Sequence, residues 1–282
     1  NPPAPRLLDS AAIISDLQFL SSDLCEGRKP GTAGHEQALQ RLATKLRSAA
    51  VDSFDNSLLQ DFTTKAVNGT TKATNIVGFV KGTASPQKFI VITAHYDHLG
   101  IAADGKIFHG ADDNASGAAC LVAMATYFKQ HPHNYSLIFA ALDREESGLD
   151  GAYELVRKFN DPSANIKMVM NFNMDMIARS DKNEIFACGI SYYPVFRQVV
   201  EETRRKTTVK LLMGHDTGGG IDDWTKQSDH YAFLRAGIPF LYIGVEDHPD
   251  YHKVTDTFDK VDKGKYIENC NMLLQMILLL KP

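Results

Sequence analysis

Apolar and polar positions follow two patterns along the chain, one typical of buried strands and the other of amphipathic helices. Positions 90–92 and 137–142 are apolar throughout, as strands in the centre of a sheet are. The expected strands lie at 75–80, 89–94, 136–142, 168–174, 184–188, 209–213 and 240–245. The expected helices lie at 10–21, 34–50, 115–130, 148–159, 193–206, 229–236 and 263–280. Because strands and helices alternate, we predict an α/β fold with a largely parallel (mixed), twisted sheet of about eight strands, flanked by helices on both faces.

No internal repeat, low-complexity tract or long linker divides the sequence, so we predict a single domain over residues 1–282. The opening Asn-Pro-Pro-Ala-Pro is typical of an extended, disordered lead-in, which we expect to cover residues 1–8. The longest apolar stretch, 272–280, is interrupted by Gln275 and is too short to span a bilayer. We therefore expect a buried C-terminal helix and no membrane span.

Charge and cysteine usage narrow the class of protein further. The net charge of −4 and the lack of a Lys/Arg block argue against nucleic-acid binding. The four cysteines, Cys25, Cys120, Cys188 and Cys270, are widely spaced without a Cys-x-x-Cys pair, which favours buried thiols. The chain begins with Asn1 rather than Met, which leaves room for a removed signal peptide. We expect an extracytoplasmic protein, periplasmic or secreted.

Five segments that carry carboxylates or imidazoles interrupt the apolar pattern, and most of them directly follow a predicted strand. The carboxyl edge of an α/β sheet is where ligands and reacting groups gather. Together the segments offer imidazoles and several carboxylates, which are the ligands that two adjacent divalent metal ions require. The segments are His95-Tyr96-Asp97, Asp112-Asp113-Asn114, Glu145-Glu146, Asp175 and His252.

Each of the first two segments has a local interpretation with an alternative. His95 and Asp97 stand two residues apart at a strand end, so Asp97 can reach the back of the His95 ring and orient it for a metal. The alternative is a hydrogen-bonded pair without a metal. Small residues surround Asp112 and Asp113, and a carboxylate there can bridge two cations. Spacing does not decide which aspartate would bind, and either could instead cap the following helix.

The remaining segments also keep two interpretations. Glu145 and Glu146 point in different directions, so that one can ligate a metal while the other moves protons, unless both only favour a helix N-terminus. Asp175 lies in an apolar strand, where a charge is costly unless it is paired or bound to metal. His252 lies in a polar loop, and His248 is its rival. The glycine-rich loop 217–223 is either a wall of the site or a surface turn.

In combination these motifs resemble the bimetallic zinc aminopeptidases, exopeptidases with two zinc ions on an α/β sheet. A stretch at 19–32 that contains Glu26-Gly27-Arg28 also looks like the N-terminal signature of the bacterial members. The matching elements are His95-x-Asp97, the run from Gly110 to Gly117, Glu145-Glu146-x-Gly148, Met174-Asp175-Met176, Ser228-Asp229-His230 and His252-x-x-x-Asp256-Thr257.

The resemblance implies a role for each site residue. Asp113 would bridge two Zn²⁺ ions, of which one would also bind His95 and Asp175, and the other Glu146 and His252. Glu145 would be the general acid and base, Asp97 would orient His95, and Tyr251 would donate a hydrogen bond to the developing oxyanion. The peptide bond between Asp113 and Asn114 would be cis.

The implied activity is hydrolysis of the first peptide bond of peptides that have a free N-terminus, by means of two zinc ions, a bridging water and the glutamate base. Other divalent metals remain possible for this mixed set of imidazoles and carboxylates. One alternative is a glutaminyl-peptide cyclase that uses a single zinc ion, and another is a catalytically silent, peptide-binding relative. The preferred N-terminal residue and the oligomeric state do not follow from the sequence.

Overall fold

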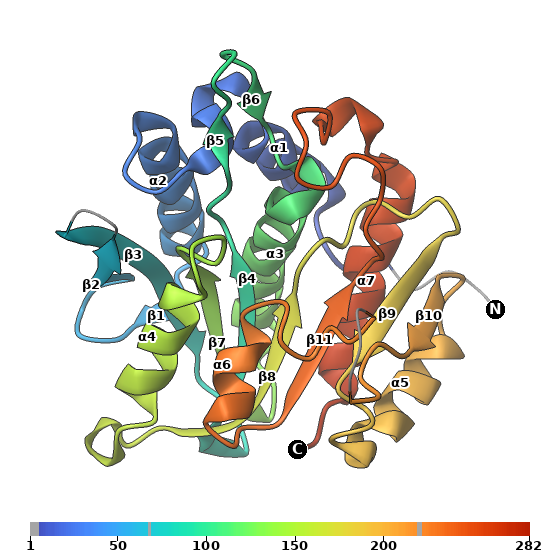
Figure 1. Cartoon of the computed structure of the whole chain (residues 1–282). Helices are drawn as coiled ribbons and strands as arrows, with labels where there is room; N and C mark the ends of the chain where they lie inside the picture. The colour runs from blue at the N-terminus through green and yellow to red at the C-terminus, as the bar shows by residue number, and fades with distance from the viewer. Residues whose placement is uncertain (1–5, 67–68, 219–221) are drawn as a thin grey trace.

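The apolar runs of the sequence form the centre of a mixed sheet in the computed structural model, which describes residues 6–66, 69–218 and 222–282 (Figure 1). Among these residues, nine strands join in the order β1-β3-β7-β4-β8-β11-β9-β10, with β2 paired to β3. The strands are β1 (Asp52–Ser53), β2 (Leu59–Ala66), β3 (Gly69–Val80), β4 (Ser85–His95), β7 (Tyr135–Leu142), β8 (Lys167–Met174), β9 (Glu184–Cys188), β10 (Lys210–Met213) and β11 (Phe240–Gly244). A separate two-stranded ribbon joins β5 (Gly100–Ile101) to β6 (Ile107–Phe108).

Helices cover both faces of the sheet, as predicted (Figure 1). Successive side chains of a strand point to opposite faces, so Ile90 and Ile92 of β4 pack on one side while Phe89 and Val91 pack on the other. The first side is covered by α1 (Ser10–Leu20), α2 (Ala33–Ser48), α3 (Gly117–Gln130), α5 (Arg197–Arg204) and α7 (Lys263–Leu279). The second side is covered by α4 (Asp150–Phe159) and α6 (His230–Arg235). This packing confirms the predicted fold class and gives a single domain.

Every predicted strand and helix has a counterpart, with two local differences. The region 193–206 divides into a short 3₁₀ turn at Pro194–Phe196, with proline at its first position, and the helix α5. The strand predicted at 75–80 begins at Gly69 and pairs antiparallel with β2, which the sequence pattern did not reveal. The segments of β2 and β3 that pair with each other lie at the edge of the sheet and are rich in threonine and lysine. They therefore lack the run of apolar residues by which a buried strand is predicted.

The four strands β7, β4, β8 and β11 are mutually parallel neighbours in the middle of the sheet. Their carboxyl ends therefore meet at one edge, where ligands bind in open α/β sheets. Each strand is followed there by one of the segments singled out above. The first residues beyond β7 are Asp143 to Glu146, and Asp175 directly follows β8.

The predicted lead-in at 1–8 lies partly outside the described residues, which begin at Arg6. Residues 6–8 form neither helix nor strand, but they are attached to the domain. The backbone N–H groups of Leu7 and Leu8 donate to Oδ1 of Asn271 on α7, at 2.7 and 3.1 Å, and Leu8 is buried. Within the described ranges, none of the helices has the length and apolarity that crossing a membrane requires.

Candidate metal centre

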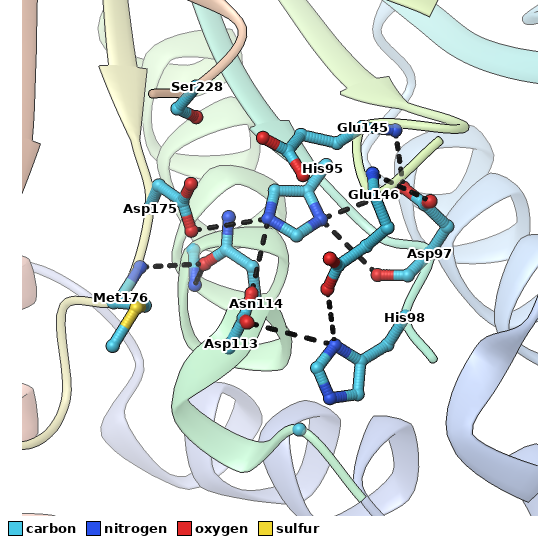
Figure 2. Close-up of polar contacts among 12 residues, drawn as sticks. His95, Asp97, His98, Asp113, Asn114, Glu145, Glu146, Asp175, Met176 and Ser228 are labelled. Atoms are coloured by element: carbon cyan, nitrogen blue, oxygen red, sulfur yellow. Dashed lines mark hydrogen bonds and ion pairs between the residues drawn. The ribbon is translucent and has the colours of Figure 1, made fainter. Parts of the chain in front are cut away.

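The predicted ligand residues converge at the carboxyl edge of the parallel strands, and Figure 2 shows four of them, His95, Asp113, Glu146 and Asp175. His95 is the last residue of β4, and Asp175 follows β8. Asp113 lies in the turn that leads into α3, Glu146 follows β7, and His252 lies in the loop after β11. Five residues that span more than half of the sequence thus meet at one edge of the sheet, carried by a strand end and by the turns and loops beside it.

Asp113 faces a histidine on each of its two sides. Its Oδ1 lies 3.3 Å from Nε2 of His95, and its Oδ2 lies 3.1 Å from Nε2 of His252. A second carboxylate accompanies each histidine. Nε2 of His95 lies 3.2 Å from Oδ1 of Asp175, and Nε2 of His252 lies 3.2 Å from Oε2 of Glu146. The site therefore has two halves that share Asp113.

These distances fit a pair of tetrahedral metal ions. A zinc ion with bonds of about 2.0–2.1 Å holds its donor atoms about 3.3–3.4 Å apart. The four separations between histidine nitrogens and carboxylate oxygens are 3.1 to 3.3 Å. The donors are also the right kind, because zinc takes imidazole nitrogens and carboxylate oxygens. The residues present therefore fit two ions that share one carboxylate.

Asp97 lies behind His95, as the strand spacing predicts, but its carboxylate has a second task. The Nδ1 of His95 lies 3.2 Å from the carbonyl oxygen of Asp97 and 3.6 Å from its Oδ1. Since a carbonyl only accepts, Nδ1 donates its hydrogen to Asp97, and Nε2 is the ring nitrogen that faces the carboxylates of Asp113 and Asp175. The Asp97 carboxylate accepts the backbone N–H groups of Glu145 and Glu146, at 3.0 and 3.4 Å.

The two adjacent glutamates sit in opposite electrostatic environments. Burial raises the pKa of Glu145 well above its usual value, opposed by His95 and reinforced by the carboxylate of Asp175. Burial acts in the same direction on Glu146, but hydrogen bonds from His252 and His98 outweigh it and lower the pKa of Glu146. A pair of carboxyl groups whose pKa values are driven apart suits a division between proton carrier and ligand.

The structure places Asp112 and Asp113 in different surroundings. Asp112 is fully buried; its Oδ1 accepts the N–H of Ala178 at 2.7 Å, and its Oδ2 lies 3.2 Å from Nε2 of His248. Both Asp112 and the rival histidine His248 therefore lie away from the site. The backbone N–H groups of Asp112 and Asp113 donate to the carboxylate of Asp256. Asp112 thus acts in packing, and Asp113 faces the histidines.

The turn that carries Asp113 is tied directly to the end of β8. The peptide bond between Asp113 and Asn114 is cis, as the resemblance implied. The Nδ2 of Asn114 donates to the carbonyl of Met174 at 2.9 Å. Its Oδ1 accepts the N–H of Met176 at 3.2 Å, the contact drawn in Figure 2. Asn114 therefore contacts the chain on both sides of Asp175, so the carboxylates of Asp113 and Asp175 are held in a common frame.

Tyr251 lies over the exposed side of the site. Its ring stacks on His252 with centroids 3.9 Å apart, and burial raises the pKa of its hydroxyl, with Asp113 as the largest of the neighbouring carboxylates. The phenol therefore keeps its proton and can donate. A recess beside the carboxylates is lined by Tyr251, Trp224, Gln227, Tyr242, Val245 and Asp247. Trp224 and Gln227 follow the glycine-rich loop 217–223, of which residues 219–221 lie outside the described residues.

Sequence reasoning missed two side chains that touch the site or its edge. His98 is buried, and its Nδ1 donates to Oε1 of Glu146 at 2.7 Å and lies 3.8 Å from Oδ2 of Asp113. Asp229 has no cap bond to α6; it is fully buried, and within the described ranges neither of its carboxylate oxygens has a hydrogen-bond partner. Burial raises the pKa of Asp229 to about 8, opposed by His95 and reinforced by Asp175. The sequence did contain a signal for each of these side chains. His98 directly follows Asp97, and Asp229 lies in the motif Ser228-Asp229-His230.

Comparisons with known proteins identify the family of the chain and agree with its fold. The family model described as peptidase family M28 matches residues 75–277, a range that contains all five converging residues, and the chain belongs to this family. Among curated relatives, "Aminopeptidase YwaD" of Bacillus subtilis is 29% identical over 204 residues, which cover 68% of this chain and 41% of that protein. The chain spans less than half the length of the curated relatives that it matches first.

Two solved structures share the fold over nearly the whole chain. A leucine aminopeptidase precursor from Bacteroides thetaiotaomicron superposes with a TM-score of 0.79 at 20% identity, over 97% of this chain and 98% of that one. A glutaminyl cyclase from the same organism, bound to N-acetylhistamine, superposes with a TM-score of 0.77 at 21% identity, over 99% and 100%. At these identities the similarity establishes the fold, which two different chemistries share.

Proposed function

We propose that this protein is a zinc-dependent aminopeptidase that removes the N-terminal residue from peptides. The observation that carries the proposal is the position of Asp113, whose two carboxylate oxygens each face Nε2 of a different histidine at 3.3 and 3.1 Å. A carboxylate whose two oxygens face two different imidazoles is placed to bridge two adjacent metal ions. Membership of peptidase family M28 and the relatives named as aminopeptidases support the reaction class.

Five side chains would hold the metal. His95 and Asp175 would bind one ion, His252 and Glu146 the other, and Asp113 both, because these are the groups that converge at 3.1 to 3.3 Å. Two zinc ions there would supply a nucleophile at neutral pH, by lowering the pKa of a water from 15.7 to roughly 7, and a Lewis acid for the peptide carbonyl. The same donor set would also accept cobalt or manganese.

Glu145 is the group that we assign to proton transfer. One oxygen of its carboxyl group lies within 4.8 Å of donor atoms of both His95 and Asp175, so it reaches the centre of the site. Its backbone is fixed by Asp97, and no histidine hydrogen-bonds its carboxylate among the described contacts. Glu145 would take the proton of the attacking water on a carboxylate oxygen and pass it to the nitrogen of the leaving amine.

Two further features bear on substrate selection. The Tyr251 hydroxyl would donate a hydrogen bond to the oxygen of the scissile carbonyl as negative charge develops there. The cluster of carboxylates that includes Asp175 and Glu145, together with Asp247 in the adjacent recess, would attract a protonated α-amine. A peptide with a free N-terminus meets this requirement, whereas an acetylated peptide does not.

The experiment compares hydrolysis and cyclisation on the same substrates. Purified protein is freed of metal, reloaded with measured amounts of zinc, and given aminoacyl amides and a Gln-leading peptide in ¹⁸O-labelled water. The proposal predicts activity that rises with zinc, label in the released amino acid, and no turnover of N-acetylated peptides. Formation of pyroglutamate without label would instead establish a cyclase, and zinc binding without any turnover would indicate a silent peptide-binding protein.

A further inference from the structure

A buried arginine far from the metal-site residues in sequence lies directly behind them in space. Arg28 ends the turn Asp23–Arg28 and is 0% exposed. Its guanidinium makes five hydrogen bonds, all to backbone carbonyl oxygens. Arginine has five N–H donors, so every one of them is used. The acceptors are the carbonyls of Tyr96 at 2.8 Å, Leu20 at 2.6 Å, His109 at 2.7 Å, Gly110 at 2.9 Å and Asp113 at 3.2 Å.

Two of these acceptors belong to the segments that form the metal site. The carbonyl of Tyr96 lies between His95 and Asp97 in the sequence, and the carbonyl of Asp113 belongs to the bridging residue itself. One planar, rigid guanidinium therefore fixes the separation between these two stretches of backbone. The backbone carbonyl of Arg28 also accepts the N–H of His98 at 3.1 Å, which adds a third connection to the site.

The local backbone is built to aim this side chain inward. Glu26, Gly27 and Arg28 have φ angles of 48°, 68° and 48°, three consecutive left-handed residues. A Cβ on Gly27 would lie 2.4 Å from the carbonyl oxygen of Gly100, so only glycine fits beneath the β5–β6 ribbon. The Glu26 carboxylate accepts the N–H of Gly34 at 3.0 Å, which fastens the turn to the start of α2.

Packing alone does not account for a buried guanidinium here. Removing a charge from water is costly, and an apolar side chain of similar volume fills a protein interior at lower cost. Burial lowers the pKa of Arg28, and the Cys25 thiol together with the carboxylates of Asp113, Asp256 and Asp97 offsets this effect only in part. The residue is therefore coupled to the same acidic groups that surround the candidate metal centre, rather than to a salt-bridge partner of its own.

We propose that Arg28 is a positioning residue of the metal centre, which sets the distance between His95 and Asp113 by holding the carbonyls of Tyr96 and Asp113 on one guanidinium. The inference rests on the proposed function, since it assumes that these two side chains share a metal ion. Residues behind metal ligands typically change metal affinity roughly 10–100-fold when they are replaced.

The test uses the full chain, freed of metal, and two substitutions of different kind. R28K keeps the positive charge but offers at most three donors from a single point, and R28M keeps the approximate length without charge or donors. The control is R41M, because the Arg41 guanidinium also connects two elements, α2 to α1 through the carboxylate of buried Asp16, but lies outside the site. Zinc affinity is measured by competition with a chelator, and the coordination geometry by the absorption spectrum of the Co²⁺-loaded protein.

We expect both Arg28 variants to bind zinc roughly 10–100-fold more weakly than the wild type, with an altered Co²⁺ spectrum, and R41M to match the wild type. Thermal melting of the metal-free proteins distinguishes a positioning role from a purely structural one. If Arg28 is only structural, its replacement lowers the melting temperature but leaves the zinc affinity and the Co²⁺ spectrum unchanged. That outcome would overturn the inference. R28K carries the test if R28M does not fold. If all variants bind zinc tightly, the role of Arg28 is wrong but the proposed function stands. If the wild type binds no zinc, both the proposed function and the role of Arg28 are wrong.

Discussion

The backbone N–H of Glu145 donates a hydrogen bond of 3.0 Å to Oδ1 of Asp97. The residue that backs the metal-facing histidine His95 thus also fixes the main chain of the residue that we assign to proton transfer. In the proposed mechanism, metal binding by His95 and proton transfer by Glu145 would both depend on the placement of the fully buried Asp97. The hydrogen bond also explains why an acidic residue follows His95 by two positions.

The substitution D97N tests this dual role. An asparagine oxygen can still accept the N–H of Glu145, but the charge behind His95 is lost, and with it part of the basicity of Nε2. We expect zinc affinity to fall roughly 10–100-fold. Chelator competition on the metal-free protein measures it. An affinity equal to that of the wild type would show that the carbonyl of Asp97 alone orients the ring.

The substitution E145Q separates metal binding from proton transfer. Glutamine has nearly the same shape as glutamate but accepts no proton. Because Glu145 is not one of the five proposed ligands, the zinc content should stay at the wild-type value. General acid–base catalysis contributes about 10²- to 10⁴-fold, and we expect kcat to fall by that factor. Zinc analysis and turnover of an aminoacyl amide are measured on the same preparation. Full activity in E145Q would remove Glu145 from its role, and loss of zinc would make it a ligand.

The substitution Y251F tests the proposed oxyanion contact. It removes only the hydroxyl and leaves the stacking on His252, which has a centroid distance of 3.9 Å. Loss of one donor to a developing oxyanion lowers kcat by about 10²-fold, and KM should change far less. Steady-state kinetics with saturating zinc distinguish the two parameters. A change confined to KM would assign Tyr251 to substrate binding instead.

A buried histidine outside the site makes folding stability depend on pH. His230 is fully buried, and burial lowers its pKa to about 3, offset in part by the Trp224 carbonyl that its Nε2–H contacts at 3.0 Å. In the unfolded chain the same group titrates near pH 6.5. Between these values the unfolded state binds one proton more than the folded state, so stability is lost as the pH falls below about 6.5.

The variant H230Q isolates this effect, because glutamine can donate to Trp224 and does not titrate. Below about pH 6 the wild type should lose about 1.4 kcal/mol of unfolding free energy per pH unit relative to H230Q. Urea unfolding of the metal-free proteins between pH 7 and pH 5 measures the difference. Parallel curves for the two proteins would show that His230 accepts a proton in the folded state.

Much of the fold was predictable because its signals are local. The runs at 90–92 and 137–142 are apolar at every position, and both became central strands. The strand β2 was missed because its pairing with β3 satisfies the backbone at an exposed edge, where threonine and lysine carry no burial pattern. The positions of Asp175 and Glu146 at strand ends followed directly from the strand prediction.

The remaining features depend on contacts that a sequence does not display. Asp112 and Asp113 are adjacent and identical, and only the direction of each side chain separates the packing residue from the one that faces His95 and His252. Arg28 lies within the motif Glu26-Gly27-Arg28, but its acceptors are backbone carbonyls from 8 to 85 positions away. Every residue has a backbone carbonyl, so the residue types in the sequence do not predict which carbonyls Arg28 will contact.

The central proposal is a pair of metal ions that share Asp113, and anomalous X-ray scattering tests it most directly. Crystals of the zinc-loaded protein are measured above and below the zinc absorption edge. We expect two anomalous peaks, one between Asp113, His95 and Asp175 and the other between Asp113, His252 and Glu146. A single peak in a fully loaded protein, or peaks away from Asp113, would contradict the proposal.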